Sequence, residues 1–303
     1  MKKKLGLLLV GLSVAVLAAC GEANDVDETN EPAGDEEEQT SDVVDGETIV
    51  FGLTTWTSTE APTNIAKLIL EEAGYEVEFS MLDQPVIFEG LVNEDVHFFM
   101  DAWLPYTEAE LWSRYEDDLQ KVATSYSDVP LGWVVPAYVE EDSIEDLVGN
   151  ADKYDGRVVS IDPGAGIVTL SEELIAEYGI GDEYTLTTSS EFAMMAEAEE
   201  RIAAEEPVIF TGWRPHSMFA KFDLKFLEDE KEIFKSDDVY VISYNGIEDE
   251  YTRAYEILSN WSIEVADLEE MMLKYEEDDV PFEESAKQWI EDNRDQVDEM
   301  LGN

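Results

Sequence analysis

Short apolar runs alternate with amphipathic segments along most of the chain, starting near residue 48. Three runs in the first half have the length and composition of buried strands, and helical spacing of apolar positions follows each of them. The predicted strands are Thr48–Trp56, Tyr75–Leu82 and His97–Leu104, and the predicted helices are residues 61–74, 86–91 and 107–118. This alternation is typical of a parallel sheet with helices on its faces.

A second series of strands and helices follows the apolar run Pro130–Val139. Its predicted strands are Arg157–Asp162, Tyr184–Thr187 and Pro207–Trp213, and its predicted helices are residues 143–148, a segment from Ile167, 190–205 and 217–222. A last strand, Val239–Tyr244, leads into a helical tail, residues 248–301, which breaks near Asp279–Pro281. The pattern predicts an α/β protein that crosses twice between two lobes, near residues 130–140 and 235–245.

This outline is that of a two-lobed, type II periplasmic-binding-protein fold, with a mostly parallel, helix-flanked sheet in each lobe. We expect residues 47–135 plus 240–303 to form lobe 1 and residues 136–239 to form lobe 2. The ligand is expected in the cleft between the lobes, because ligands of open α/β sheets bind at the carboxyl ends of strands.

The amino terminus has the features of a lipoprotein signal peptide. Met1-Lys-Lys-Lys is positively charged, Leu5–Ala19 is apolar but short for a spanning helix, and Leu17-Ala-Ala-Cys20 matches the bacterial lipobox. We expect cleavage after residue 19 and acylation of Cys20, which would anchor the protein at the extracytoplasmic face of the cell membrane. The alternative is a plain secretory signal with an incidental cysteine. Residues 20–46 are acidic and aperiodic, as in a disordered tether.

The charge balance is extreme, with 73 Asp and Glu against 18 Lys and Arg and a formal net charge of −55. The chain has no basic patch to meet phosphates, which argues against nucleic acid as a partner. Acidic residues are spread over the whole chain, and this favours a protein that works in concentrated salt. A single cysteine and two histidines leave no intrachain disulfide and no His-rich metal centre, and we expect no metal or cofactor.

We expect the melting temperature to rise with NaCl over the molar range, because ions screen the repulsion among the acidic side chains. Thermal unfolding followed by circular dichroism at increasing NaCl measures this dependence. A melting temperature that stays flat from low to high salt would contradict the screening argument.

Three of the seven tryptophans, Trp56, Trp103 and Trp213, follow directly on apolar strand-like runs. The carboxyl ends of parallel strands meet at one edge of a sheet, so these indoles could form an aromatic box. A quaternary ammonium has no N–H to donate, and indole faces attract it without that requirement. The other four, Trp112, Trp133, Trp261 and Trp289, are expected to be packing residues.

The loop Asp162-Pro-Gly-Ala-Gly166-Ile167 leads into a predicted helix. Free amides and the helix dipole make such a helix start receptive to an anion. Taken alone, the loop is better explained as a simple tight turn between a strand and a helix.

The motifs together resemble the glycine-betaine-binding lipoproteins of bacterial osmoprotectant ABC importers. The matching segments are Thr55-Trp56 with Ser58-x-x-x-Pro-Thr-Asn64, Asp101-Ala-Trp-Leu-Pro105, Gly132-Trp-Val-Val-Pro136, Asp162–Ile167 and Gly212-Trp-Arg-Pro-His216. The resemblance implies that Trp56, Trp103 and Trp213 surround a trimethylammonium group and that the amides of Gly166 and Ile167 hold the ligand carboxylate. It also implies an ABC permease as partner and glycine betaine, proline betaine or choline as ligand.

Glu108 departs from the family pattern Trp-Leu-Pro-x-x-His, whose histidine also binds the ligand carboxylate. Two facing carboxylates repel each other, and desolvation makes this worse. Three explanations are open. Glu108 is protonated or turned away, and Arg214 or Tyr106 binds the ligand carboxylate instead. Alternatively, the ligand is a cation without a carboxylate, such as choline, or the glutamate simply lowers the affinity. Because the helix-end loop is retained, we favour a betaine, with choline as the alternative.

A binding protein is favoured over an enzyme. The chain lacks Gly-x-Ser-x-Gly and His-Glu-x-x-His motifs, and no pair among its 73 acids is singled out for glycoside hydrolysis. A secreted carbohydrate-active enzyme is the less favoured alternative. A sensing lipoprotein, which would share the fold and the site, is also left open.

Overall fold

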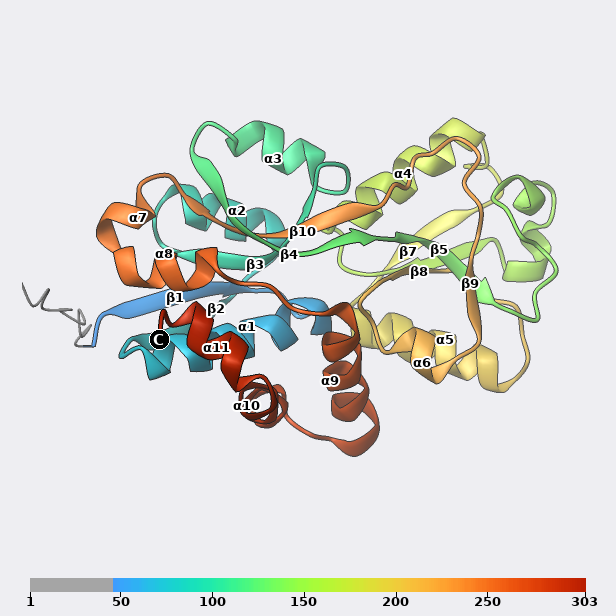
Figure 1. Cartoon of the computed structure of the whole chain (residues 1–303). Coiled ribbons are helices and arrows are strands. Elements are labelled where there is room, and N and C mark those ends of the chain that lie inside the picture. Colours follow the sequence, from blue (N-terminus) through green and yellow to red (C-terminus); the bar gives the residue numbers. More distant parts are fainter. Residues whose placement is uncertain (1–45) are drawn as a thin grey trace, which may run out of the picture. The chain divides into compact units, whose positions relative to one another are not determined.

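The computed structural model describes residues 46–303, which contain two five-stranded sheets (Figure 1). Each sheet with the helices packed on it is called a lobe below. The predicted signal peptide (1–19), the acylation site Cys20 and the tether up to residue 45 lie outside the described residues. Within residues 46–303, no helix combines the length and the apolar character needed to cross a bilayer.

The first sheet has the strand order β2-β1-β3-β10-β4. Its strands are β1 (Thr48–Leu53), β2 (Glu76–Met81), β3 (Phe98–Leu104), β4 (Leu119–Val129) and β10 (Asp237–Tyr244). Strands β2, β1 and β3 are parallel, whereas β10 runs antiparallel to both of its neighbours. Helices α2 (Gln84–Val92) and α3 (Ala109–Tyr115) lie on one side of this sheet and α1 (Thr57–Glu72) on the other (Figure 1).

The second sheet repeats this pattern with the order β7-β6-β8-β5-β9. Its strands are β5 (Leu131–Pro136), β6 (Arg157–Ser160), β7 (Thr185–Thr188), β8 (Phe210–Trp213) and β9 (Leu224–Phe226). Strands β7, β6 and β8 are parallel, and β5 is antiparallel to β8 and β9. The helical elements of this lobe are η1 (Glu145–Leu147), η2 (Ala151–Tyr154), α4 (Gly166–Tyr178), α5 (Glu191–Ala203) and α6 (Met218–Lys221).

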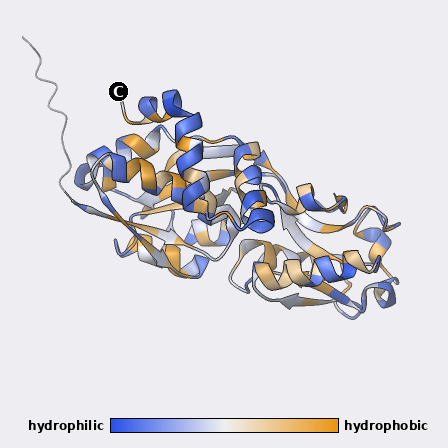
Figure 2. Ribbon diagram, turned by 90° about the horizontal axis from the view of Figure 1, so that it is seen from below, coloured by the Kyte–Doolittle hydropathy of each residue, from blue (hydrophilic) through white to orange (hydrophobic). Residues whose placement is uncertain are grey.

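The tail returns to the first lobe, where α9 and α10 pack against α1. Its helices are α7 (Ile247–Glu250), α8 (Thr252–Ser259), α9 (Val265–Asp278), α10 (Phe282–Asp292) and α11 (Arg294–Met300). Hydrophobic and hydrophilic residues alternate around the helices in Figure 2, as expected for helices with one face on a core. Strands β3 and β5 are buried at every position, which explains their uninterrupted apolar runs.

The structure confirms the two-sheet α/β fold: four strands of each sheet run in one direction, and β10 or β5 is the antiparallel one. It differs from the prediction in one lobe boundary and in the edge strands β4 and β9, which were not predicted. Residues 131–135, expected in lobe 1, belong to β5 of the second sheet, so the first crossing lies at Pro130. Strand β4 was not predicted, because this edge strand is largely polar and half exposed.

Candidate functional site

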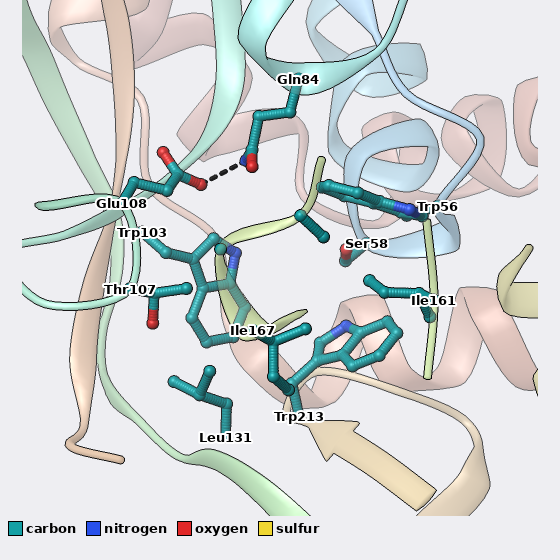
Figure 3. Close-up of a pocket in the computed structure, with 12 residues that line it drawn as sticks. Trp56, Ser58, Gln84, Trp103, Thr107, Glu108, Leu131, Ile161, Ile167 and Trp213 are labelled. Carbon is teal, nitrogen blue, oxygen red and sulfur yellow. Dashed lines mark hydrogen bonds between the residues drawn. The ribbon is translucent and has the colours of Figure 1, made fainter. Parts of the chain in front are cut away.

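A cavity of about 350 Å³ of space between atoms lies where the two lobes meet, and three indole rings surround it (Figure 3). The first lobe contributes six lining residues: Trp56, Ser58, Gln84, Trp103, Thr107 and Glu108. The second lobe contributes Leu131, Ile161, Ala165, Gly166, Ile167 and Trp213. Most of them follow the carboxyl end of a parallel strand or lie within its last residues, which is the expected place for a ligand in such sheets.

Trp56 lies three residues after β1 and is the N-cap residue of α1. Its indole N–H donates a 3.0 Å hydrogen bond to Oδ2 of Asp162, which follows β6 in the other lobe. This bond turns the indole nitrogen toward a carboxylate at the rim, and the ring forms one wall of the cavity. It also ties the two lobes together.

Trp103 is held by Asp101, its neighbour two positions earlier on the same face of β3. The indole N–H donates to Asp101 Oδ1 at 2.8 Å, and Asp101 Oδ2 accepts from the hydroxyls of Ser58 (3.0 Å) and Thr59 (2.7 Å). Burial raises the pKa of the Asp101 carboxyl above its ordinary value. The three hydrogen bonds lower this pKa, but they do not cancel the rise. The network fixes the second wall of the cavity and leaves a carboxyl group behind it.

Trp213 ends β8 and packs edge-on against the His216 ring, with ring centroids 5.0 Å apart. His216 Nδ1 accepts the Met218 amide at 3.0 Å, so in a neutral ring the other nitrogen carries the proton, 3.2 Å from Glu191 Oε1. Glu191 in turn accepts hydrogen bonds from the Thr57 amide (3.1 Å) and hydroxyl (2.8 Å) at the start of α1. The third wall thus packs on a histidine that lies beside a glutamate, and this glutamate is hydrogen-bonded to the other lobe.

The start of α4 lines the cavity from the second lobe, as Glu108 does from the first. Gly166 and Ile167 are the first two residues of this helix, Ala165 provides no side-chain cap, and neither amide donates to an acceptor among the described residues. Gly166 approaches the other lobe so closely that a Cβ atom there would lie 2.4 Å from the Thr107 carbonyl oxygen. A glycine is therefore required where the helix start meets lobe 1.

Glu108 is the N-cap residue of α3, and its side chain is buried in the lining of the cavity. One carboxyl oxygen accepts a hydrogen bond from the Gln84 side-chain amide, as Figure 3 shows. Burial raises the pKa of the Glu108 carboxyl well above its ordinary value, and the nearby charges of Asp101 and Asp237 raise it further. Hydrogen bonds from the Trp103 backbone and from the Gln84 side chain lower this pKa without cancelling the rise.

Two residues that were predicted for the anion end lie outside the cavity lining. Arg214 is paired with Glu269 of α9 at 2.8 Å, and its guanidinium stacks over the Phe219 ring. The Tyr106 ring is 43% exposed and lies under the Lys235 ammonium. The structure therefore brings together Trp56, Trp103, Trp213, Gly166, Ile167 and Glu108, but not Arg214 or Tyr106.

The lining is chemically divided into an apolar, aromatic part and a small polar end. It contains no Lys or Arg, and its one ionisable side chain is Glu108. Indole faces with carboxylates at their edges attract a cation that has no N–H, and helix-start amides accept an anion. Among the described residues, no cluster of His, Cys, Asp and Glu is arranged to hold a metal ion. The arrangement suits a small zwitterion with a bulky cationic end.

The sequence of residues 47–292 matches the family of substrate-binding domains of ABC-type glycine betaine transport systems. The chain belongs to this family. It is 37% identical over 142 residues to the glycine betaine/carnitine transport binding protein GbuC of Listeria monocytogenes. That match covers 46% of this chain and 47% of the relative, so the chain spans about half the length of this curated protein.

Two solved structures that are similar to this chain contain different ligands. Lactococcal OpuAC, in its closed conformation with glycine betaine, is similar with a TM-score of 0.80 and 31% identity, over 84% of this chain and 99% of that one. An ABC-transporter choline-binding protein in complex with choline is similar with a TM-score of 0.79 and 25% identity, over 84% and 91%. The two similarities are nearly equal, so the overall fold does not discriminate between a betaine and choline.

Several lining residues escaped the sequence analysis. Gln84 follows β2 in the same way that Trp56 follows β1, so the strand-end rule could have identified it. Thr107, Leu131, Ile161 and Ala165 carry no distinctive chemistry, and nothing in the sequence marks them. Glu191 and Thr57 lie 134 positions apart, and no local pattern predicts that they meet.

Proposed function

We propose that this protein is an extracytoplasmic solute-binding protein that captures glycine betaine or a related quaternary-ammonium osmoprotectant for an ABC permease. The observation that carries this proposal is the three-indole cavity with the unpaired amides of Gly166 and Ile167 at its polar end. The indoles would hold the trimethylammonium group, and the two amides would hold the carboxylate. Membership of the glycine betaine family supports this assignment.

The energies are sufficient for useful affinity. Each desolvated indole contributes roughly 0.5–2 kcal/mol to cation binding, and each hydrogen bond to a charged group adds roughly 1.5–3 kcal/mol. Three indoles and two amides can therefore approach the ~8 kcal/mol that corresponds to micromolar binding.

Choline is the second candidate, and Glu108 is the observation that favours it. The Glu108 carboxyl group at the polar end can accept a hydrogen bond from the choline hydroxyl. If it is ionised, it repels the carboxylate group of a betaine. The unpaired amides of α4 have no counterpart on choline, and they favour a betaine as the principal ligand.

The location of the protein is part of the proposal. Acylation of Cys20 would anchor it at the outer face of the cell membrane, and the acidic residues 20–46 would hold the binding lobes away from the lipid. Excess acidic residues would keep it soluble in concentrated salt.

We expect calorimetric titration in high salt to give binding of glycine betaine and proline betaine at roughly micromolar Kd, and weaker binding of choline. Carnitine is a larger ligand and tests the size of the cavity. Proline is the negative control, because it is a zwitterion without a quaternary ammonium group. Absence of heat with all four quaternary ligands would refute the proposed function, while tighter binding of choline than of betaine would reverse the ligand assignment.

A further inference from the structure

The Glu108 side chain has an unused hydrogen-bonding atom in the cavity. Its Oε1 accepts the Gln84 amide, whereas its Oε2 is buried without a hydrogen-bond partner among the described residues. The Gln84 carbonyl oxygen beside it is likewise unpaired. The glutamate is 2% exposed, so solvent does not satisfy these atoms. An unpaired buried carboxyl oxygen can be satisfied by carrying a proton and donating it to a ligand.

No cation compensates a negative charge on Glu108. The carboxyl groups of Asp101 on β3 and Asp237 at the start of β10 face it, and both disfavour its ionisation. Helix α2 presents the uncharged Gln84, and the start of α4 presents Gly166 and Ile167. On its own helix, Arg114 is exposed and paired with Glu110 at 2.9 Å. Burial without a counter-charge raises the pKa of the Glu108 carboxyl.

We propose that Glu108 carries a proton at neutral pH and donates it in a hydrogen bond to the carboxylate of the bound zwitterion. This inference rests on the proposed function. The ligand carboxylate would then lie between the Glu108 carboxylic acid on one lobe and the α4 amides on the other. An O–H donor to a carboxylate forms a short, charge-assisted bond, and this side chain thereby selects a ligand with an anionic end.

The sign of the pH effect follows from the protonation state. Below the pKa of Glu108 the acid donates and the betaine binds well; above it, two carboxylates face each other in a desolvated site. Binding of a betaine is therefore coupled to proton uptake at alkaline pH, and the affinity falls as pH rises. Choline behaves in the opposite way, because an ionised Glu108 attracts its cation and accepts its hydroxyl.

The test is calorimetric titration of the whole protein with glycine betaine and with choline, between about pH 5 and about pH 9 in buffers of different ionisation enthalpy. Above the pKa of Glu108, we expect the Kd for glycine betaine to rise by about tenfold per pH unit, with up to about one proton taken up per ligand. The Kd for choline should stay level or fall. Glu108→Gln should bind glycine betaine with a level pH profile and no proton uptake.

Glu110→Gln is the matched control, since it removes an exposed glutamate two positions away and should keep the pH profile of the unmodified protein. A second readout does not depend on ligand. Glu108→Gln should melt above the unmodified protein at neutral and alkaline pH, because the glutamate ionises in the unfolded chain while the fold keeps it protonated, and the difference should shrink as pH falls through the ordinary pKa of a glutamate.

Each outcome has a distinct meaning. Betaine binding that strengthens at alkaline pH overturns the proton-donor role and leaves the proposed function intact. Binding that is level with pH does the same when the melting temperatures of Glu108→Gln and the unmodified protein also keep a constant difference. A Glu108→Gln profile that still falls with pH also overturns it, because another group would be titrating. Failure of the unmodified protein to bind any quaternary ligand at any pH refutes the proposed function instead.

Discussion

Replacing Trp103 by alanine is expected to weaken binding of glycine betaine by roughly tenfold or more. The substitution removes one indole face from the cavity and the apolar contact area that goes with it. It also lets water reach the site, and water weakens the attraction of the remaining rings for the cation. Titration followed by tryptophan fluorescence or calorimetry measures the loss, and circular dichroism checks that the fold is retained.

Two further variants separate the aromatic face from its support. Trp103→Phe keeps a ring over the cavity but removes the N–H that donates to Asp101, so we expect an intermediate loss. Trp289→Phe is the matched control, because the Trp289 N–H donates to Asp267 at 2.8 Å in the helical tail, away from the cavity. Unchanged affinity in Trp103→Ala would refute the assignment of this residue to the cation site, and equal losses in Trp103→Ala and Trp289→Phe would indicate a general effect on stability.

Replacing Gly166 by alanine is expected to weaken betaine binding by about a hundredfold, because two charge-assisted hydrogen bonds of roughly 1.5 kcal/mol each are lost. The new Cβ atom would lie 2.4 Å from the Thr107 carbonyl oxygen and 2.7 Å from its methyl group. Neither lobe can absorb this overlap without moving backbone, so the start of α4 is pushed away from lobe 1. The two amides then no longer reach a carboxylate held by the indoles.

Gly181→Ala provides the control for this variant. Its Cβ would meet Ile175 at 3.5 Å, an ordinary contact in the same lobe, so we expect unchanged binding. Alanine suits a first helical position, and Gly166→Ala should fold normally by circular dichroism. A variant that folds and binds betaine as the unmodified protein does would show that the lobes need not approach this closely when ligand is bound.

The sequence predicted the walls of the site because their position depends on a general rule. Trp56, Trp103 and Trp213 follow or end apolar strands, and the carboxyl ends of parallel strands meet at one edge whatever the details of the helices. Glu108 was marked by its departure from a family motif. The sequence left its protonation as one alternative among several, because the rise of its pKa depends on burial and on two carboxylates, Asp101 and Asp237, that only the fold brings close.

The features that the sequence did not predict depend on tertiary pairing. Strand β4 has a polar, half-exposed sequence and becomes a strand through its antiparallel pairing with β10, which is more than 100 positions away. Arg214 looked available for an anion, but a glutamate of α9 pairs with it. In a chain with 73 acids and 18 bases, most cations find an acidic partner, so a free arginine is a poor expectation.

The hydrogen bonds from Trp56 to Asp162 and from Thr57 to Glu191 exist only while the lobes are in contact. If the lobes separate in solution, these bonds favour the closed arrangement, and the apparent Kd then equals the intrinsic Kd divided by the closed fraction. A substitution at Glu191, which is not a lining residue but supports Trp213 through His216, is expected to shift the apparent Kd of every quaternary ligand in the same direction. We therefore expect selectivity and overall affinity to respond to different residues, with Glu108 discriminating among ligands and the bonds between the lobes affecting the binding of all of them.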